Sequence, residues 1–321
     1  MKIKAIHEAV HRITTPYYGG GTVYLYLIRG DQVALVDTGG AACPQQVIQP
    51  ALAQLGMAFT DVDLILNTHA HLDHIGGNAE ARRLSGAQIF VPAADLPMAE
   101  SVDAEVEFHL TPLRVLEFDQ EWLQTRGEYI RHNAGEAAGA DRVVNDGDVI
   151  DLGAGIRLRV VACPGHTPGH VAYYWERTGY LFSGDAVQGQ GARPGVWPYY
   201  FDAPAYRRSL ATLAALAPQT LCMAHAYLLD SMAINEATRR GEEARSMLQE
   251  SAQIADTIHR AVVEADARLP GASKRQVALA ALADLIYEVP QLHDRKIGMP
   301  RLAGATLLAH IDAARAGTYP A

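Results

Sequence analysis

The sequence predicts an α/β protein that ends in an α-helical region, and three observations support this prediction. Short apolar, β-branched runs alternate with helical patterns between residues 22 and 92, as they do in layered α/β folds. From about residue 229, apolar side chains recur every three or four residues without a strand pattern. The length of 321 residues allows two domains, or one large domain with an appendage. We therefore expect a main domain over residues 1–228 and an α-helical region over residues 229–321.

The first part of the main domain consists of short elements separated by turns. Arg29–Asp31 forms a turn between two strands, which predicts an antiparallel pair. Gly56 and Gly86 are expected to end the first two helices. In order, we expect strands at 22–28 and 32–37, a helix at 44–55, a strand at 63–68, a helix at 77–86 and a strand at 87–92.

Residues 93–146 interrupt this alternation, because aromatic and basic side chains are mixed there with loop signals. We interpret them as a partly helical insertion. Strand and helix patterns return after it and then give way to helices alone. In order, we expect hairpins at 146–165 and 171–185, a helix at 204–216, a strand at 221–225 and helices at 229–268, 274–288 and 300–315.

Composition excludes several classes of protein. The hydrophobic fraction of 49% is typical of a folded core, and no apolar run approaches the ~20 residues that a membrane helix needs. The net charge of −9 argues against a nucleic-acid partner, whose binding surface would be basic. The first residues contain no apolar segment of the kind that secretory signals carry. The three cysteines are sparse and form no CxxC, so we expect a reduced, cytoplasmic protein that acts on a small molecule.

The segment LILNTHAHLDHIGGN at residues 64–78 carries the strongest functional signal. His69, His71, Asp73 and His74 directly follow a buried strand and precede a glycine pair, so one loop can turn all four side chains toward one point. Imidazoles combined with a carboxylate suit zinc, and iron or manganese are possible alternatives. The segment therefore predicts a metal site.

Three further candidate ligands stand at the ends of apolar runs. His166 lies in CPGHTPGH, Asp185 in LFSGDA and His225 in CMAHAY. Together with the first group they make five histidines and two aspartates. This set is enough for two four-coordinate ions once a shared carboxylate and a shared hydroxide are counted.

These motifs, in this order, resemble those of the metallo-β-lactamase-fold superfamily, whose hallmark is THxHxDHxGG. The resemblance extends from about residue 20 to 228. It implies a four-layer αββα sandwich with a metal centre at one edge of two facing sheets. Carried over by position, it implies a first metal on His69, His71 and His166, a second on Asp73, His74 and His225, and Asp185 as the bridge. It also implies that Asp37 and His170 contact metal ligands without binding metal themselves, and that Asp37 orients a ligand imidazole.

The implied chemistry is metal-assisted hydrolysis by a hydroxide that bridges two zinc ions, with Asp73 as the proton shuttle. His71 distinguishes the chain from flavin-coupled oxygen reductases, which have glutamate there, and Asp185 distinguishes it from true β-lactamases. Small esters, lactones and thioesters remain as substrates. His170 and the helical tail resemble glyoxalase II, although the loop after Asp185 lacks its usual glutathione-binding pattern. Lactonases often have tyrosine where Gln188 stands. A mononuclear-iron persulfide dioxygenase and a phosphodiesterase stay open as alternatives.

Candidate pocket residues follow the bridging aspartate. Glycines precede an aromatic segment that can form the wall of a substrate pocket. Tyr227, two residues after His225, can donate a hydrogen bond to a developing oxyanion and is our second catalytic candidate. We expect the insertion and the tail to cap the active site, or to form a homodimer contact that does so. The pocket candidates are Trp197, Tyr199, Tyr200 and Phe201, with Arg193, Arg295 and Lys296 as candidate carboxylate ligands.

Overall fold

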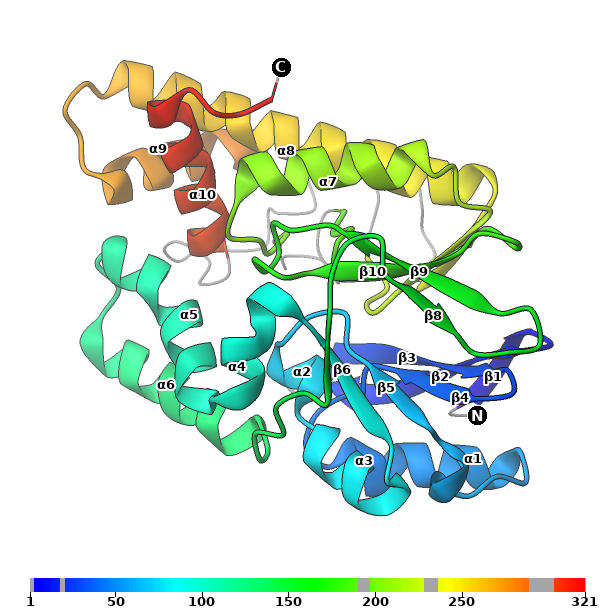
Figure 1. Cartoon of the computed structure of the whole chain (residues 1–321). Helices are drawn as coiled ribbons and strands as arrows, with labels where there is room; N and C mark the ends of the chain where they lie inside the picture. The colour runs from blue at the N-terminus through cyan, green and yellow to red at the C-terminus, as the bar shows by residue number, and fades with distance from the viewer. Residues whose placement is uncertain (1–2, 18–20, 190–196, 228–235, 289–302, 321) are drawn as a thin grey trace.

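The protein is described from a computed structural model, which covers residues 3–17, 21–189, 197–227, 236–288 and 303–320. Two β-sheets lie face to face, and helices cover the outer face of each (Figure 1). Helices α1 (Gln49–Gln54) and α3 (Asn78–Ser85) lie against one sheet. Helices α7 (Ala203–Ala215) and α8 (Glu242–Arg268) lie against the other. The αββα sandwich is therefore confirmed.

The first sheet has the strand order β1 to β7, which is also the order along the chain. Strands β1 to β4 pair antiparallel, and β4 to β7 pair parallel. The predicted pair at 22–28 and 32–37 forms here as β3 and β4. The strands are β1 (Ile3–His7), β2 (Val10–Tyr17), β3 (Gly21–Arg29), β4 (Val33–Val36), β5 (Leu64–Leu66), β6 (Gln88–Pro92) and β7 (Arg142–Val144).

The second sheet has the order β13-β12-β11-β10-β9-β8. Strands β11 and β12 pair parallel, whereas the other neighbours pair antiparallel. Both predicted hairpins form, as β8–β9 and β10–β11. The strands are β8 (Val149–Asp151), β9 (Arg157–Ala162), β10 (Val171–Trp175), β11 (Tyr180–Gly184), β12 (Thr220–Met223) and β13 (Thr238–Arg240).

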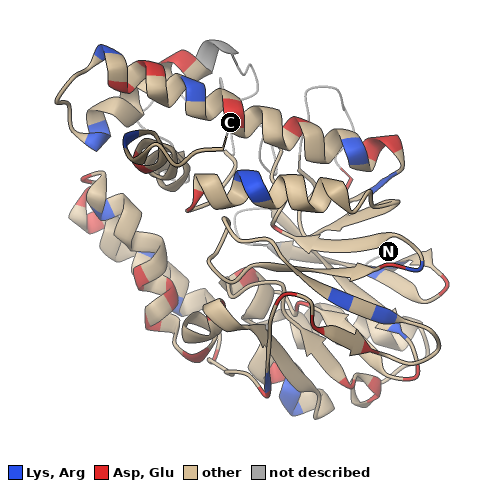
Figure 2. Cartoon of the chain, turned by 45° about the horizontal axis from the view of Figure 1, so that its top comes forward, with Lys and Arg blue, Asp and Glu red and all other residues tan. Residues whose placement is uncertain are grey.

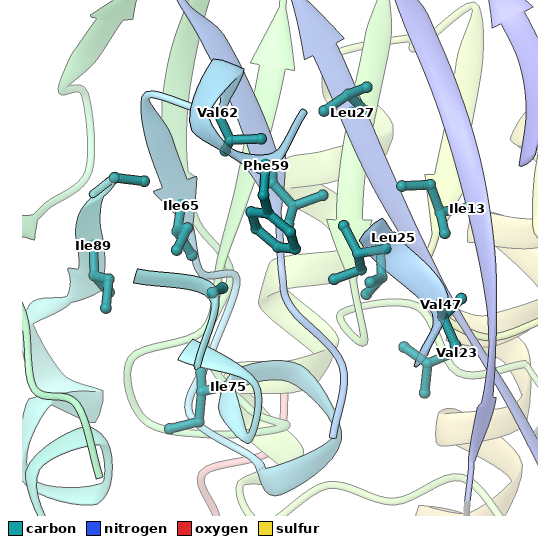
Figure 3. Packing of buried hydrophobic residues seen from close by; sticks show 14 of the residues in the cluster. Ile13, Val23, Leu25, Leu27, Val47, Phe59, Val62, Ile65, Ile75 and Ile89 are labelled. Atoms are coloured by element: carbon teal, nitrogen blue, oxygen red, sulfur yellow. The ribbon is translucent and has the colours of Figure 1, made fainter. Parts of the chain in front are cut away.

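Alternation of side chains along the strands explains the layers. In β3, Leu25 and Leu27 face α1, whereas Tyr26 and Ile28 face the other sheet. The same alternation in β10 sends Tyr173 into the space between the sheets. Figure 3 shows the packing between the first sheet and its helices, where Leu25, Phe59 and Ile65 lie close together. Each sheet is thus buried on both faces, and the loops at the strand ends are left to form a site.

The insertion at 93–146 is mostly helical, as expected. It contains α4 (Leu96–Glu100), α5 (Val102–Val115) and α6 (Gln120–Asn133), before β7 rejoins the first sheet. Ser101 begins α5 by accepting a hydrogen bond from the Ala104 N–H at 3.3 Å. Asp119 begins α6 in the same way with the Trp122 N–H at 3.0 Å.

The tail differs from expectation in one element. Residues 229–268 are predicted to be helical, but Thr238–Arg240 form β13, which pairs with β12. Elsewhere in the described part of the tail, the structure contains the helices α8, α9 (Lys274–Glu288) and α10 (Ala303–Ala316). These helices pack together around an apolar cluster that also contains Leu116 of the insertion.

Charged residues of both signs are interspersed along the outer helices (Figure 2). Along α8, for example, Glu242 pairs with Arg245 and Asp266 pairs with Arg315. Among the residues that the structure covers, no helix combines the length and the apolar character that a membrane span requires.

Candidate metal centre

The candidate ligands come from loops at the carboxyl ends of four strands. His69 follows β5, His166 follows β9, Asp185 directly follows β11 and His225 follows β12. The short helix α2 (Leu72–Ile75) carries Asp73 and His74. All seven predicted ligands are buried, with at most 8% of any residue exposed. Both sheets therefore contribute ligands to one edge of the sandwich.

The first three-histidine group matches the ligand set implied for the first metal. The ligand atoms of His69, His71 and His166 all lie within 4.8 Å of one another. The Nε2 atoms of His69 and His166 are 3.2 Å apart. Two neutral imidazole nitrogens at this distance can share one cation, so this group can hold a metal ion.

The second group matches the set implied for the second metal. Ligand atoms of Asp73, His74 and His225 likewise lie within 4.8 Å of one another. Asp73 Oδ2 lies 3.3 Å from His225 Nε2 and 3.7 Å from His74 Nε2. The mixed imidazole and carboxylate donors again suit a divalent transition-metal cation.

Asp185 lies between the two groups. Its Oδ2 atom is 3.5 Å from His166 Nε2 of the first group and 3.5 Å from His225 Nε2 of the second. Its Oδ1 atom is 3.7 Å from His74 Nε2. One carboxylate thus faces both groups, which is the position of a bridging ligand.

Unpartnered atoms and local charge show that these residues fit metal cations. Within the described part of the chain, His71 Nε2, His74 Nε2 and Asp185 Oδ1 are buried without a hydrogen-bond partner. Such atoms are costly to bury unless something binds them. Burial alone would lower the pKa of His74, but the adjacent carboxylates, led by Asp73 and Asp185, raise it to about 10. The centre therefore combines negative charge with ligand atoms that have no hydrogen-bond partner. Bound divalent cations would neutralise this charge and coordinate these atoms.

Four ligand imidazoles are fixed by a hydrogen bond at Nδ1, which leaves Nε2 directed to the centre. A metal-binding histidine is usually oriented in this way, because the bond at one nitrogen fixes both the ring and its tautomer. The acceptors are Thr68 Oγ1 for His69 at 3.0 Å, Asp37 Oδ2 for His74 at 2.9 Å, the Tyr199 carbonyl for His166 and the Thr22 carbonyl for His225 at 2.8 Å.

Asp37 has the orienting position that the resemblance implies. Its carboxylate accepts bonds from His74 Nδ1 and from both the N–H and the hydroxyl of Thr68, the latter two at 2.8 Å. Its φ of 59° is in the left-handed region, which aspartate tolerates better than most residues. Asp37 therefore links His74 directly, and His69 through Thr68, to the end of β4.

His170 contacts Asp185 directly. Its Nε2 accepts a hydrogen bond from the Asp185 N–H at 3.0 Å, and its Nδ1 lies 3.2 Å from Cys163 Sγ. The ring also stacks on His69, with centroids 4.8 Å apart. Gly184 permits this close packing, because a Cβ there would lie 2.6 Å from Thr68 Oγ1. Cys163 and Cys222 are buried, as expected of small apolar residues.

Asp95 is a buried carboxylate that sequence reasoning missed. It accepts hydrogen bonds from the Ala70 N–H at 3.0 Å, the Thr167 hydroxyl at 2.6 Å and the Gly169 N–H at 2.6 Å. Burial raises the pKa of Asp95 to about 6, against the effect of these donors. The residue ties the His69–His71 loop to the loop after His166. Its only sequence signal is its place after the strand at 87–92.

Glu105 and His109 of α5 were also missed. Glu105 Oε1 accepts a hydrogen bond from the Leu72 N–H at 2.7 Å, at the start of α2. His109 Nδ1 bonds the Tyr199 hydroxyl at 2.7 Å, and its ring lies 4.5 Å from that of His71. Their spacing of four residues on one helix face is the signal that could have revealed them. The insertion therefore contacts the candidate metal centre.

The structure separates the pocket candidates. Tyr199 and Phe201 lie beside the centre, with ring centroids 6.3 and 6.2 Å from His71. Trp197 instead packs in the apolar cluster of the tail helices. Tyr200 is buried against Tyr206, with stacked rings 4.0 Å apart. Arg193, Arg295 and Lys296 lie outside the described residues.

Tyr227 is at the centre. It is buried, and its ring lies 5.6 Å from that of His225. Burial, followed by the negative charge of Asp185, raises the pKa of Tyr227 well above its usual value. The phenol therefore stays protonated and can act as a donor. Gln188 donates through Nε2 to the Asp185 carbonyl at 2.9 Å and so braces the same loop.

Comparison with known families agrees with this geometry. A family model described as the metallo-beta-lactamase superfamily matches residues 18–225, which include every candidate ligand. The chain belongs to the metallo-beta-lactamase superfamily. Membership in this superfamily implies a metal cofactor, which the vacant donors and the negative charge of the centre fit.

Related curated proteins are named hydroxyacylglutathione hydrolase. The one from Albidiferax ferrireducens is 32% identical over 214 residues, covering 65% of this chain and 64% of the relative. The one from Rhodospirillum rubrum is 31% identical over 52% of this chain and 49% of the relative. The chain thus spans less than two thirds of these two relatives. One from Fuscovulum blasticum is 27% identical over 88% of both chains.

Two solved structures share the fold over nearly the whole chain. A metallo-beta-lactamase family protein from Thermus thermophilus has a TM-score of 0.72 and 25% identity, covering 98% of this chain and 95% of its own. A beta-lactamase domain protein from Burkholderia ambifaria has a TM-score of 0.67 and 19% identity, covering 98% and 89%. The shared region includes the insertion and the helical tail.

Proposed function

We propose that this protein is a dinuclear zinc hydrolase that cleaves a small thioester, ester or lactone. The observation that carries the proposal is the pair of three-ligand groups that face one carboxylate, Asp185. Imidazole and carboxylate donors in such groups suit zinc, although iron and manganese accept similar donors. Two complete groups favour a dinuclear hydrolase over an enzyme with a single iron.

The names of the curated relatives support an acyl substrate. Hydroxyacylglutathione is a thioester, and the relatives with this name are about 30% identical to the chain. When bound, two divalent cations supply Lewis acidity and lower the pKa of water toward about 7. In the proposed reaction, the oxygen of water adds to the acyl carbon, the bond to the leaving sulfur or oxygen breaks, and a proton from water ends on the leaving atom.

Two side chains of the protein have defined roles in this reaction. Burial would raise the pKa of Asp73, but the imidazoles of His74 and His225 bring it below its usual value, so the group is a carboxylate. Placed among the ligands, Asp73 can transfer the proton from water to the leaving atom. Tyr227 keeps its proton and can donate a hydrogen bond to the oxyanion that develops on the acyl carbon.

Metal analysis and a substrate panel test the proposal. We expect the full chain, produced with zinc, iron and manganese all supplied, to contain two zinc ions per chain. We also expect it to cleave at least one substrate among a glutathione thioester, an aryl ester and an acyl-homoserine lactone. One iron per chain would instead support the persulfide dioxygenase, and cleavage of bis-p-nitrophenyl phosphate alone would support a phosphodiesterase. Either result would reject the proposed function.

Tyr227→Phe tests the proposed oxyanion donor. We expect kcat to fall about 100-fold while the metal content stays unchanged, because one donor to a developing oxyanion contributes about this much. Tyr174→Phe is the matched control, since that hydroxyl donates to the Leu216 carbonyl at 3.2 Å on the outer face of the second sheet. Wild-type kcat in Tyr227→Phe would exclude the role.

A further inference from the structure

Three aromatic rings from two distant segments meet beside His71. Phe108 of α5 lies 4.2 Å from Phe201, and Phe201 lies 4.9 Å from Tyr199. Each ring centroid lies between 5.9 and 6.3 Å from that of His71. We call these three residues, Phe108, Tyr199 and Phe201, the aromatic wall.

The aromatic wall presents apolar surface next to the reaction centre. Its three residues are only partly buried, whereas all seven candidate ligands are buried. Its one polar group, the Tyr199 hydroxyl, already bonds His109 Nδ1 at 2.7 Å, so what remains for a ligand is ring surface. Partly exposed rings at the edge of a catalytic centre are suited to an apolar group of the substrate.

The position of the aromatic wall indicates which part of the substrate it contacts. The wall adjoins His71 of the first group, whereas Asp73 belongs to the second. In the proposed reaction Asp73 transfers the proton to the leaving atom, so the leaving atom lies near Asp73. The acyl side chain, on the other side of the scissile bond, then extends toward the first group and the wall.

We propose that the aromatic wall binds an apolar acyl side chain, so that the substrate is a thioester or ester with an aromatic or branched acyl group. This inference rests on the proposed hydrolase function and narrows it. It also separates the protein from relatives named for a polar hydroxyacyl group. An apolar ring surface gives a hydroxyl no partner, whereas a phenyl or branched alkyl group gains contact area.

The wall is held in place before any substrate binds. Glu105 fixes α5 to the start of α2 through the Leu72 N–H. The segment before Phe201 is held by Thr306 of α10, which donates to the Pro198 carbonyl at 2.7 Å and accepts from the Tyr200 N–H at 3.2 Å. Preorganised contacts of this kind reduce the cost of binding and sharpen selectivity.

A thioester series with one leaving group tests the inference. The full metal-loaded chain is assayed with N-acetylcysteamine thioesters whose acyl groups are acetyl, lactoyl, isovaleryl and phenylacetyl. We expect kcat/KM for the phenylacetyl and isovaleryl thioesters to exceed that for the lactoyl thioester at least about tenfold, since even one methylene group changes this ratio by about tenfold or more. In a second series the acyl group is always phenylacetyl and the leaving group varies. We expect kcat/KM to change less across this series than across the first.

Substitutions in the aromatic wall test whether it causes the preference for apolar acyl groups. Phe108→Ala and Phe201→Ala should each lower the phenylacetyl-to-acetyl ratio of kcat/KM about tenfold, because only the larger acyl group loses contact area when a ring is removed. Phe118→Ala is the matched control, because Phe118 is in the same insertion but packs against Trp122, with ring centroids 5.7 Å apart. Metal content and melting temperature show that each variant is folded, and Phe108→Leu supplies a milder substitution should Phe108→Ala unfold.

The outcomes separate the two proposals. Cleavage of none of the esters, lactones or thioesters would overturn the hydrolase function and the acyl assignment together. Cleavage at rates that do not depend on the acyl group, or that respond only to the leaving group, would overturn the role of the wall and leave the hydrolase standing. An unchanged ratio in both folded phenylalanine variants would do the same.

Discussion

At the scale of single residues, the candidate metal centre depends on side chains that orient the ligands without binding metal themselves. Asp37 illustrates this, because one carboxylate orients His74 directly and His69 through Thr68. It does so from a left-handed backbone conformation with φ 59°. Strain of this kind persists where the surrounding contacts compensate for it, and here the compensation comes from three hydrogen bonds to the carboxylate.

Asp37→Asn isolates this orienting effect. Asparagine tolerates the same backbone conformation, but its amide nitrogen cannot accept the hydrogen bond from His74 Nδ1. We expect metal affinity or kcat/KM to fall about 10–100-fold, as is usual for the loss of a group that orients a ligand. Asp185→Asn should be more severe, because it removes a ligand that faces both groups. Elemental analysis and steady-state kinetics measure both effects.

Asp63→Asn serves as the control for these variants. Asp63 is exposed and accepts a hydrogen bond from the Val33 N–H at 2.8 Å, so it makes a comparable bond far from the ligands. Its replacement should leave metal content unchanged. Full metal content and activity in Asp185→Asn would show that Asp185 is not the bridging residue.

At the scale of elements, helix α10 connects the tail to the centre. His310 Nε2 accepts a hydrogen bond from the Tyr200 hydroxyl at 2.7 Å, and Tyr199, next to it, accepts through its carbonyl from the ligand His166. Burial lowers the pKa of His310 well below its usual value, and the adjacent His259 adds to this effect. A neutral His310 is therefore part of the folded state.

Acidification should consequently weaken the docking of α10. Because the pKa of His310 is lower in the folded than in the unfolded chain, the unfolded chain binds more protons below about pH 6.5. Stability from this residue is complete above that pH and is lost as the pH falls, at up to about 1.4 kcal/mol per pH unit. We expect wild type to lose free energy of unfolding relative to His310→Gln between pH 7 and 5. Denaturant unfolding at several pH values measures the difference.

The matched control is His132→Gln, since His132 is exposed on α6. It should follow the pH dependence of wild type, because it keeps the buried His310. A wild type and a His310→Gln variant with parallel pH profiles would show that His310 titrates normally and does not link acidity to this helix.

The elements differ in how far sequence could predict them. Strands such as 22–28 were predictable because apolar, β-branched runs identify them locally. Residues 238–240 were not, because Thr-Arg-Arg is polar and becomes a strand only by pairing with β12, where Arg239 is buried. The alternation of β1 and β2 was likewise overlooked among the polar residues of the first segment.

The same distinction holds for the site. The four candidate ligands at 69–74 were predictable because they lie within six consecutive positions. The three later candidates were predictable because each stands at the end of an apolar run. Asp95 and Glu105 have no such local pattern. They reach the centre only because the insertion folds back over the loop at residues 70–72, whose N–H groups they accept. This placement depends on tertiary packing.

At the scale of the whole molecule, the tail is part of the sandwich and not a separable appendage. Strand β13 extends the second sheet beside β12, the strand that leads to His225. The apolar face of α8, including Met247 and Leu248, is buried against the α7 side of that sheet. Removing the tail would expose this face and leave β12 as an unprotected edge strand, a template for association with other chains.

Two truncations test this view of the molecule. Ending the chain at residue 235 should yield insoluble protein without bound metal. Each large apolar side chain that this truncation exposes costs about 1.5–3 kcal/mol, against a total stability of about 5–15 kcal/mol.

Ending the chain at residue 288 removes only α10 and the residues before it, so β13 and α8 stay in place. We expect that shorter chain to bind metal but to melt at a lower temperature and to lose acyl selectivity, because Thr306 no longer holds the segment beside the centre. Solubility, metal content and the thioester series distinguish the two truncations. A soluble, metal-loaded chain ending at residue 235 would show that the sandwich is complete without its tail.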